Sequence, residues 1–211
     1  MGASKLVVLL MFTRDSMRLT LFCLLALALL PSFTQAQEQV PVFTVVKEQS
    51  SIKFSVKASV AIQGTFDQWD ATLTFPSTDV TSAVLDIKIQ AASVNTGSGM
   101  KDDKLRGKDF FDVKQAPLIT FHSTKIVQTG PTTVEIPGTF TIRGVSRSET
   151  LSFNLIGKGT GNGEIKGIMA FDRKEYGMNS GIPFIKIADR VEVSVDLKGK
   201  KISGPLPVFK E

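Results

Sequence analysis

The side chains that could carry out chemistry in this sequence are few and widely spaced. A serine–histidine hydrolase needs a histidine beside its nucleophile, and the only histidine, His122, lies on the polar phase of an apolar strand pattern, where it faces water. Zinc sites draw on several histidines or cysteines, whereas the chain has one of each. The carboxylate pairs Asp67/Asp70 and Asp109/Asp112 could act as acid and base, but such residues are common in turns. We therefore predict no catalytic residue, no metal site and no cofactor, in a protein that is not an enzyme.

Basic side chains gather in residues 101–109 and could bind a phosphate or another polar head group. Acidic side chains are interleaved with them there, which is typical of a solvated helix face, and we favour that interpretation. The whole chain has 25 lysines and arginines against 20 aspartates and glutamates, and the signs alternate rather than cluster. Nucleic-acid binding usually shows a basic stripe, so the composition argues against a nucleic-acid partner.

Most of the chain after Val42 alternates apolar and polar residues with a period of two, which predicts half-buried antiparallel strands. Ile52 and Phe54 share one face, for example, while Lys53 lies on the other. Turn residues separate about eight or nine such segments. Short strands in that number form a sandwich or a barrel, and an eight-stranded barrel is either filled by side chains or holds one small ligand.

Residues 98–113 break the alternation and predict a helical segment. They are polar and charged, with Leu105, Phe110 and Phe111 spaced for a short helix. Gly107 weakens it, because glycine costs about 1 kcal/mol against alanine in a helix interior. We expect a helical turn or two that caps one end of the sheet.

Residues 1–36 predict a cleaved secretory signal rather than folded structure. From Met17 the chain has a basic residue, an apolar stretch over residues 19–30 and a small residue, Ala36, at the cleavage point. The stretch is shorter than the roughly 20 residues of a membrane-spanning helix. We expect translation to begin at Met17 and a single mature domain of residues 37–211, with an uncleaved anchor as the alternative. The only cysteine lies in the signal, so the mature domain would form no disulfide.

Three motifs, in order along the chain, resemble the YceI-like family. The first is KDDKLRGKDFFDV at residues 101–113, followed by APLITF at residues 116–121. The second is GTFTIRG at residues 138–144, which continues into ETL at residues 149–151, and the third is FDRKEYGM at residues 171–178. The order and spacing also match, and the resemblance covers essentially the whole mature domain.

Two positions depart from the family pattern. The aromatic residue that is more often phenylalanine in the family is Tyr176, and the hairpin carries SRSE at residues 146–149 where threonine, lysine and proline are common. Both changes fall on turns, so they affect the detail of a ligand site rather than the fold.

The resemblance implies an all-β fold, a single antiparallel eight-stranded barrel like that of a lipocalin, with a short capping helix. It also implies export in bacteria, hence a periplasmic location, and a long apolar lumen that takes polyisoprenoid chains or similar amphiphiles. Some family members adjoin or are fused to membrane b-type cytochromes, which suggests an isoprenoid quinone or its precursor as ligand and a cytochrome or a lipid donor as partner. A homodimer through an outer face is equally compatible with the pattern.

The candidate lumen residues are large apolar side chains on, or beside, the apolar phase of their strands: Phe54, Phe66, Trp69, Phe75, Phe121, Phe140, Phe153, Met169 and Phe171. For a head group at the barrel mouth the candidates are Arg106, Arg143 and Arg173, although an arginine in such a turn could instead hold the turn itself. Taken alone, the apolar residues favour a solid core, and the resemblance reverses that preference for the set.

We therefore expect an exported carrier or buffer that solvates a polyisoprenoid-type chain in an apolar barrel. Burial contributes about 0.8 kcal/mol per methylene, so about ten methylenes supply roughly 8 kcal/mol against an association cost of about 4–15 kcal/mol, and long chains should bind best. Two alternatives stay open. One is an enzyme that acts on an isoprenoid or a sugar through a carboxylate pair, and the other is a structural or stress-related barrel filled by its own side chains.

Overall fold

The computed structural model describes residues 39–59, 61–181 and 186–210, so the expected signal over residues 1–36 lies outside the described residues. The strands are β1 (Val42–Val45), β2 (Ser51–Ala58), β3 (Ile62–Phe66), β4 (Trp69–Thr74), β5 (Val84–Gln90), β6 (Val94–Asn95), β7 (Leu118–Ser123), β8 (Val127–Gln128), β9 (Thr133–Ile142), β10 (Val145–Ile156), β11 (Asn162–Asp172) and β12 (Ile187–Ser203). The described helices are α2 (Gly99–Arg106) and the 3₁₀ turns η1 (Lys47–Gln49), η2 (Val80–Ser82), η3 (Ala91–Ser93) and η4 (Arg173–Tyr176).

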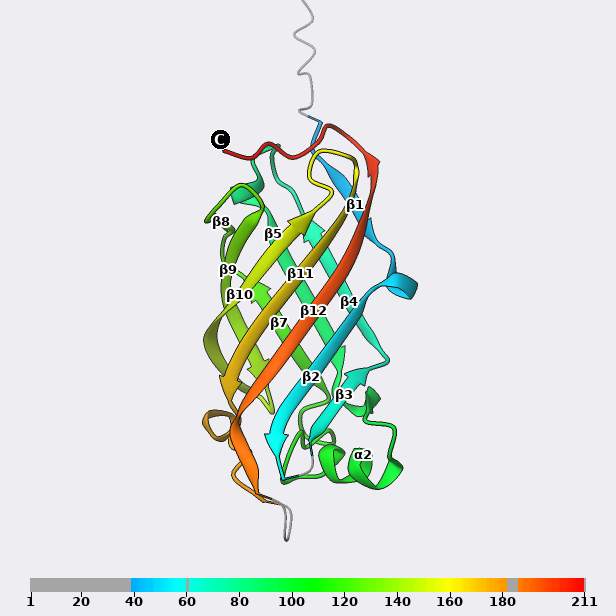
Figure 1. The fold of residues 1–211 in the computed structure, drawn as a ribbon, viewed down its shortest axis with the longest axis vertical. Helices are drawn as coiled ribbons and strands as arrows, with labels where there is room; N and C mark the ends of the chain where they lie inside the picture. The colour runs from blue at the N-terminus through cyan, green and yellow to red at the C-terminus, as the bar shows by residue number, and fades with distance from the viewer. Residues whose placement is uncertain (1–38, 60, 182–185, 211) are drawn as a thin grey trace, which may run out of the picture. The chain divides into compact units, whose positions relative to one another are not determined.

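The strands form one closed antiparallel barrel (Figure 1). Three walls are each made of two successive strands, β1 with β2, β3 with β4, and β5 with β6. The walls that follow are β7, β9, β10, β11 and β12, and β12 closes the ring by pairing with both β1 and β2. The described part of the chain therefore confirms the predicted eight-stranded antiparallel barrel. Among the described residues, no helix is both long and apolar enough to cross a membrane.

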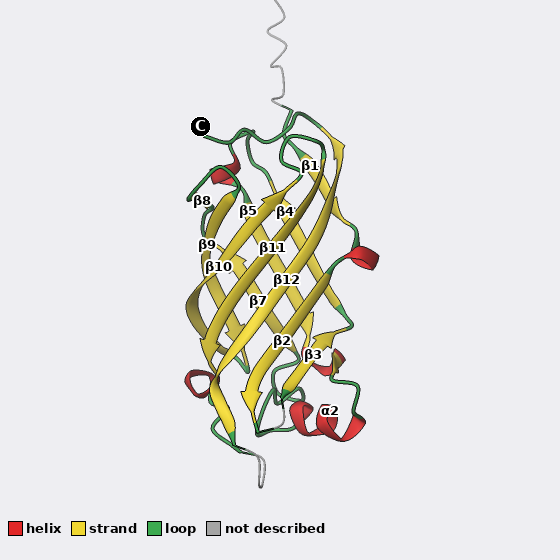
Figure 2. Cartoon of the chain, in the orientation of Figure 1, coloured by secondary structure: helices red, strands yellow, loops and turns green. Residues whose placement is uncertain are grey.

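The period-two alternation of the sequence is seen in the strands, which make up most of the described chain (Figure 2). In β2, Ile52 and Phe54 are buried and Lys53 is exposed, as predicted. The long β9–β10 hairpin turns on Arg143 and Gly144, which both have positive φ, 56° and 75°. This backbone twist is the one that two-residue hairpin turns favour, because it matches the twist of the flanking strands.

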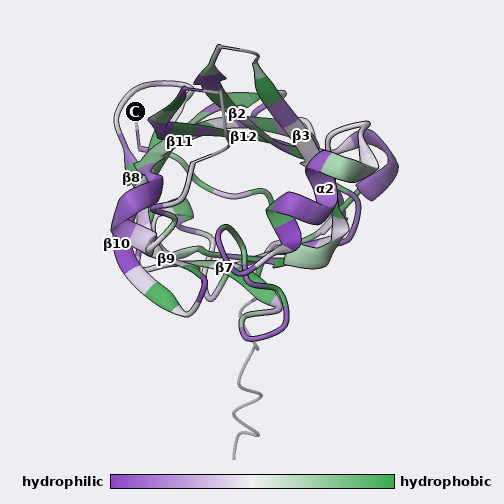
Figure 3. Cartoon of the chain, turned by 90° about the horizontal axis from the view of Figure 1, so that it is seen from below, coloured by the Kyte–Doolittle hydropathy of each residue, from purple (hydrophilic) through white to green (hydrophobic). Residues whose placement is uncertain are grey.

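Figure 3 looks along the barrel from the end at which α2 lies, which we call the α2 end. The predicted helix is confirmed within residues 98–113 but is short. It ends at Arg106, where the backbone of Gly107 is extended (φ −67°, ψ 167°) and the Gly107 N–H donates to the Lys104 carbonyl at 3.2 Å. Buried Asp102 ties the start of the helix to the preceding loop, since its Oδ1 accepts hydrogen bonds from the Thr96 N–H at 2.8 Å and the Thr96 hydroxyl at 2.7 Å.

Residues 204–210 run across the opposite rim, which we call the C-terminal end (Figure 1). The Val208 N–H donates to the Thr78 carbonyl at 2.7 Å, and the Val80 N–H donates to the Val208 carbonyl at 3.1 Å. The Gln128 side chain holds Lys210 through hydrogen bonds of 2.7 and 2.9 Å to its backbone. The last residues of the described chain are therefore fastened to the loop after β4 and to β8.

Candidate ligand-binding site

A cavity of about 260 Å³ lies inside the C-terminal end of the barrel. Inward-facing apolar side chains from most walls line it, among them Phe43, Leu73, Phe75, Val134, Phe153, Ile165 and Leu197. The C-terminal segment adds Leu206, Pro207 and Phe209. Exposed residues of the β10–β11 turn, such as Lys158, also belong to the lining, so the cavity reaches the protein surface at this rim.

A smaller cavity of about 70 Å³ lies at the α2 end. Aromatic rings surround it, and they contact one another: the centroids of Phe54 and Phe66 are 5.6 Å apart, and those of Phe66 and Phe111 are 5.8 Å apart. Phe140 and Phe171 form a second pair at 5.2 Å. Such tilted aromatic pairs favour each other beyond the area that they bury, so this end of the lumen is mostly filled by side chains.

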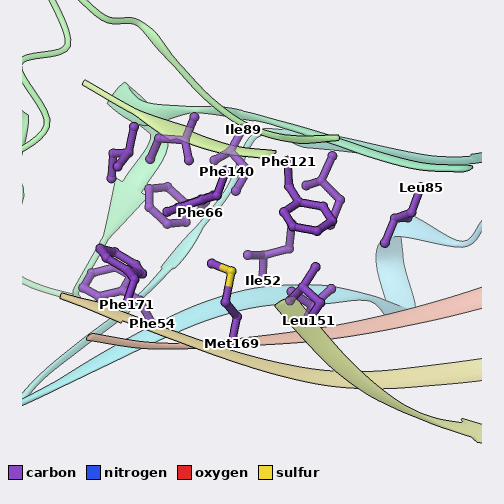
Figure 4. Close-up of a cluster of buried hydrophobic side chains, with 14 of the residues drawn as sticks. Ile52, Phe54, Phe66, Leu85, Ile89, Phe121, Phe140, Leu151, Met169 and Phe171 are labelled. Atoms are coloured by element: carbon purple, nitrogen blue, oxygen red, sulfur yellow. The ribbon is translucent and has the colours of Figure 1, made fainter. Parts of the chain in front are cut away.

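The lumen between the two cavities is closed by buried side chains. On β11, Ile165 lines the larger cavity and Phe171 the smaller, while Met169, between them on the same face, lines neither. Figure 4 shows Met169 and Phe121 reaching into the middle of the lumen from opposite walls. We give the name partition to five buried, inward-facing side chains that line neither cavity: Ile87, Phe121, Leu151, Met169 and Val195.

The structure distributes the predicted lumen residues over these three layers. Phe75 and Phe153 line the larger cavity. Phe54, Phe66, Phe140 and Phe171 line the smaller one. Phe121 and Met169 belong to the partition, and Trp69 is half-buried against the core and lines neither cavity. The predicted set is inward-facing or core-packed throughout, but it does not surround one continuous space.

The guanidinium groups of the three candidate arginines are engaged by the protein itself. In Arg106, Nε donates to the Ala92 carbonyl at 2.8 Å and Nη2 donates to the Val94 carbonyl at 3.1 Å. Its Nη1 forms an ion pair with Asp103 at 3.0 Å. Arg106 therefore fastens α2 to the segment before it, and it lines neither cavity.

Arg143 and Arg173 hold turns at the α2 end. Arg143 donates to the Gly177 carbonyl and, from Nη2, to the Lys108 carbonyl at 3.0 Å. Arg173 is buried beside the smaller cavity and donates to several carbonyls, that of Ser180 at 3.0 Å among them, and to Asp189 at 3.2 Å. Donors that already have acceptors are poorly placed to take on a ligand, because the old bonds would have to break. The exception here is the Nε of Arg143, which is buried and has no hydrogen-bond partner among the described residues.

A carboxylate beside Arg173 has a shifted pKa. The Lys174 ammonium, 2.8 Å from the Asp189 carboxylate, holds the pKa of Asp189 below its ordinary value, and the Arg173 guanidinium adds to that effect. Asp189 therefore stays ionised and anchors two cations of the η4 turn.

The two departures from the family pattern contact each other. Tyr176 is fully buried, with its ring against Phe140 at 5.5 Å and Phe171 at 5.1 Å. Its hydroxyl donates to Glu149 Oε1 at 2.8 Å. Burial raises the pKa of the Tyr176 phenol, and the Glu149 carboxylate raises it further, so the hydroxyl keeps its proton. Tyrosine at position 176 thus has its partner in the hairpin that also departs from the pattern.

The rim of the larger cavity carries a cation that the sequence motifs did not indicate. Lys158 Nζ lies 4.4 Å from the centroid of the Phe209 ring and donates to the Pro131 carbonyl at 3.1 Å. The side chain is exposed, and it borders the cavity where the apolar lining meets water. No strand periodicity extends into residues 204–210, which is why Phe209 was missed.

The side chains considered above for catalysis lie away from both cavities. His122 faces solvent, as predicted, and its Nδ1 is 2.6 Å from Asp86 Oδ1 on the outer face of the barrel. The carboxylates of the pairs Asp67/Asp70 and Asp109/Asp112 line neither cavity. Within the residues that the structure describes, no three His, Cys, Asp or Glu side chains come together in a group that could hold a metal ion.

Solved structures with a similar fold are available from three bacteria. BcnA of Burkholderia cenocepacia is 24% identical, with a TM-score of 0.67 over 74% of this chain and 99% of that one. A YceI protein of Campylobacter jejuni is 26% identical, with a TM-score of 0.56 over 67% and 85% of the two chains. A domain of Saccharophagus degradans described as polyisoprenoid binding is 16% identical, with a TM-score of 0.61 over 77% and 99%.

Comparisons of sequence identify the family to which the chain belongs. Protein YceI of Escherichia coli O157:H7 is 34% identical over 98 residues, 46% of this chain and 51% of that protein. A UPF0312 protein of Pseudomonas syringae pv. tomato is 31% identical over the same length, so the chain spans about half of these curated relatives. The model of the YceI-like domain matches residues 43–199. This match confirms the resemblance inferred from the three motifs: the chain belongs to the family of YceI-like domains.

Proposed function

We propose that this protein is an exported, periplasmic carrier that holds the chain of an isoprenoid-type lipid in the larger cavity. The observation that carries the proposal is the cavity itself, about 260 Å³ of apolar space that reaches the surface at the C-terminal end. Pockets for small ligands are concave and mostly apolar, with few polar groups at defined places. The polyisoprenoid-binding description of the Saccharophagus degradans domain and the signal-like residues 1–36 support the same reading.

The size of the cavity suggests which part of a lipid it takes. At about 30 Å³ for each water-sized group, it holds on the order of nine groups, close to two isoprene units. Their burial supplies roughly 7 kcal/mol, which is of the same order as the cost of association. A longer chain gains more binding free energy only if side chains of the partition move aside. Met169 is the most adaptable of them, because its side chain is unbranched and flexible.

The head group in this proposal stays at the C-terminal rim. Lys158 is the cation of the cavity lining and could pair with a phosphate, or donate to the carbonyl of an isoprenoid quinone, without leaving water. We prefer this rim to the α2 end because Lys158 is exposed and its one hydrogen bond, to the Pro131 carbonyl, leaves ammonium donors free, whereas Arg106, Arg143 and Arg173 each hold carbonyls of the protein's own turns. A membrane lipid donor or a cytochrome would then exchange the ligand at the same rim.

Competition binding tests the proposal. A fluorescent fatty acid is bound to the purified protein and displaced with geraniol, farnesol and geranylgeraniol. We expect geraniol to displace the probe, and affinity to rise by less than about tenfold with each further isoprene unit, because about two units already fill the larger cavity and the partition opposes more. Ala71→Phe, which places a bulky ring on the wall of the larger cavity and so fills part of it, should abolish displacement of the probe. Ser194→Phe, on the exposed face of β12, should not. If no prenyl alcohol displaces the probe, or if Ala71→Phe binds as wild type, the proposal fails.

A further inference from the structure

Three phenylalanine rings of the lumen lie flat against glycines of a neighbouring strand. A β-carbon built on Gly64 would lie 2.8 Å from the Phe54 ring, one on Gly138 would lie 2.6 Å from the Phe121 ring, and one on Gly167 would lie 2.1 Å from the Phe153 ring. Carbon atoms in contact are normally about 3.5–4.0 Å apart. Each ring therefore occupies space that a side chain at the glycine would need, so part of the ring lies against the barrel wall at that glycine.

Gly167 differs from the other two glycines in what surrounds it. A β-carbon on Gly138 would also meet the His122 carbonyl at 2.5 Å, and one on Gly64 would meet the Asn95 carbonyl at 2.8 Å. At Gly167 the three nearest atoms all belong to the Phe153 ring. Its φ is not in the left-handed region, so alanine there causes no backbone strain. Only at this position does a methyl group act on the ring and not on the backbone.

The Phe153 ring can move in only one direction. It pairs directly with Gly167 across β10 and β11, is 2% exposed, and lines the larger cavity. Relief of the contact requires the ring to move away from β11 by more than about 1 Å. Because neighbouring side chains are close-packed, the space that can receive the ring is the cavity.

We propose that Gly167 determines the bore of the larger cavity, and thereby which lipid chains fit, by letting the Phe153 ring lie against the wall. Gly167 is a specificity-determining residue that never contacts the ligand itself. The statement about bore rests on geometry alone, and the statement about lipid chains rests on the proposed function.

Four proteins test this proposal: Gly167→Ala, Phe153→Leu, the double variant, and the control Gly99→Ala. Gly99 is exposed at the start of α2, lines neither cavity, and a β-carbon there meets nothing within 4 Å. Cavity size is read from xenon uptake under pressure, followed by NMR shifts of the cavity methyl groups. Chain binding is read from farnesol affinity in the same samples.

We expect Gly167→Ala to lose most of its xenon uptake and to bind farnesol about tenfold more weakly, the loss of about two buried methylene contacts. The control should match wild type in both. The double variant should match Phe153→Leu, because without the ring nothing opposes the added methyl group. If Gly167→Ala does not fold, the comparison of Phe153→Leu with the double variant decides in the same way.

Undiminished xenon uptake in Gly167→Ala, or no recovery in the double variant, overturns the proposal. A merely structural role would lower the melting temperature of Gly167→Ala and leave farnesol affinity unchanged. If xenon uptake responds as expected while farnesol binds to none of the proteins, wild type included, the proposed function fails and the role of Gly167 in the bore stands.

Discussion

Replacing Met169 with alanine tests whether the partition limits the length of chain that the barrel accepts. Met169 is 4% exposed and separates cavities of about 260 and 70 Å³. Truncation of the Met169 side chain should join the two cavities. The space that it leaves should stay open, because the neighbouring side chains already border cavities and cannot move in to fill it. We expect the ligand-free variant to lose about 2–4 kcal/mol of unfolding free energy, the range for a buried methionine-to-alanine change.

The same change should strengthen the binding of long chains. About three methylene-sized groups leave the lumen, and a chain that takes their place gains about 2 kcal/mol, or roughly thirtyfold in affinity. Geraniol, which fits in the larger cavity, should bind within about twofold of wild type. Geranylgeraniol should show the full gain and also restore part of the melting temperature, since a ligand stabilises the folded state that it binds.

The assay is calorimetric titration of both alcohols into wild type, Met169→Ala and Ile168→Ala. Ile168 is the adjacent residue on β11, points outward and is 62% exposed, so its variant controls for effects on the strand. Equal gains for the two alcohols, or no gain for either, would refute the account of the partition.

Three further outcomes follow from the contacts described above. Lys174 lowers the pKa of Asp189, so the ionised Asp189 stabilises the fold above about pH 4, and this stabilisation is lost as pH falls through the folded-state pKa. In urea titrations Asp189→Asn should be less stable than wild type at neutral pH, and the difference in unfolding free energy should shrink below about pH 4. Tyr176→Phe should cost about 1 kcal/mol in thermal unfolding, because Glu149 loses its buried donor, and replacing Glu149 with valine in that background should recover part of the loss. Phe209→Ala should weaken farnesol binding about tenfold with only a small fall in melting temperature, since this partly buried ring forms cavity wall at the rim and packs against the core rather than within it; an unchanged affinity would remove the C-terminal segment from the site.

Much of the fold follows from local pattern. Alternation in Ile52, Lys53 and Phe54 predicts which side chains face inward, because successive residues of a strand point to opposite faces. The helix within residues 98–113 was predicted, and the low helix propensity of glycine favours its end before Gly107. These features depend on neighbours in the sequence, so one chain is enough to find them.

The division of the lumen depends on register between strands that are far apart in the sequence. Whether an inward residue lines a cavity or fills the partition is set by its height along the barrel, and alternation carries no information on height. Phe121 and Phe153 look alike in the sequence, yet one belongs to the partition and the other lines the larger cavity. The role of Gly167 in making room for an aromatic ring can be recognised only once its pairing with Phe153 is known. The partners of the candidate arginines depend on tertiary structure too, because the carbonyls that they bind come from other segments of the chain.

The central claim is that the barrel carries an isoprenoid-type chain, and mass spectrometry tests it most directly. The full chain is expressed in a bacterial host, recovered from the periplasm under mild conditions, and measured first in the native state and then after denaturation. The account predicts a mass excess that leaves on denaturation and fragments as an isoprenoid, on a polypeptide that begins at Gln37. A bare polypeptide mass in the native state, with no uptake of added prenyl lipids, would contradict it and favour a barrel filled by its own side chains.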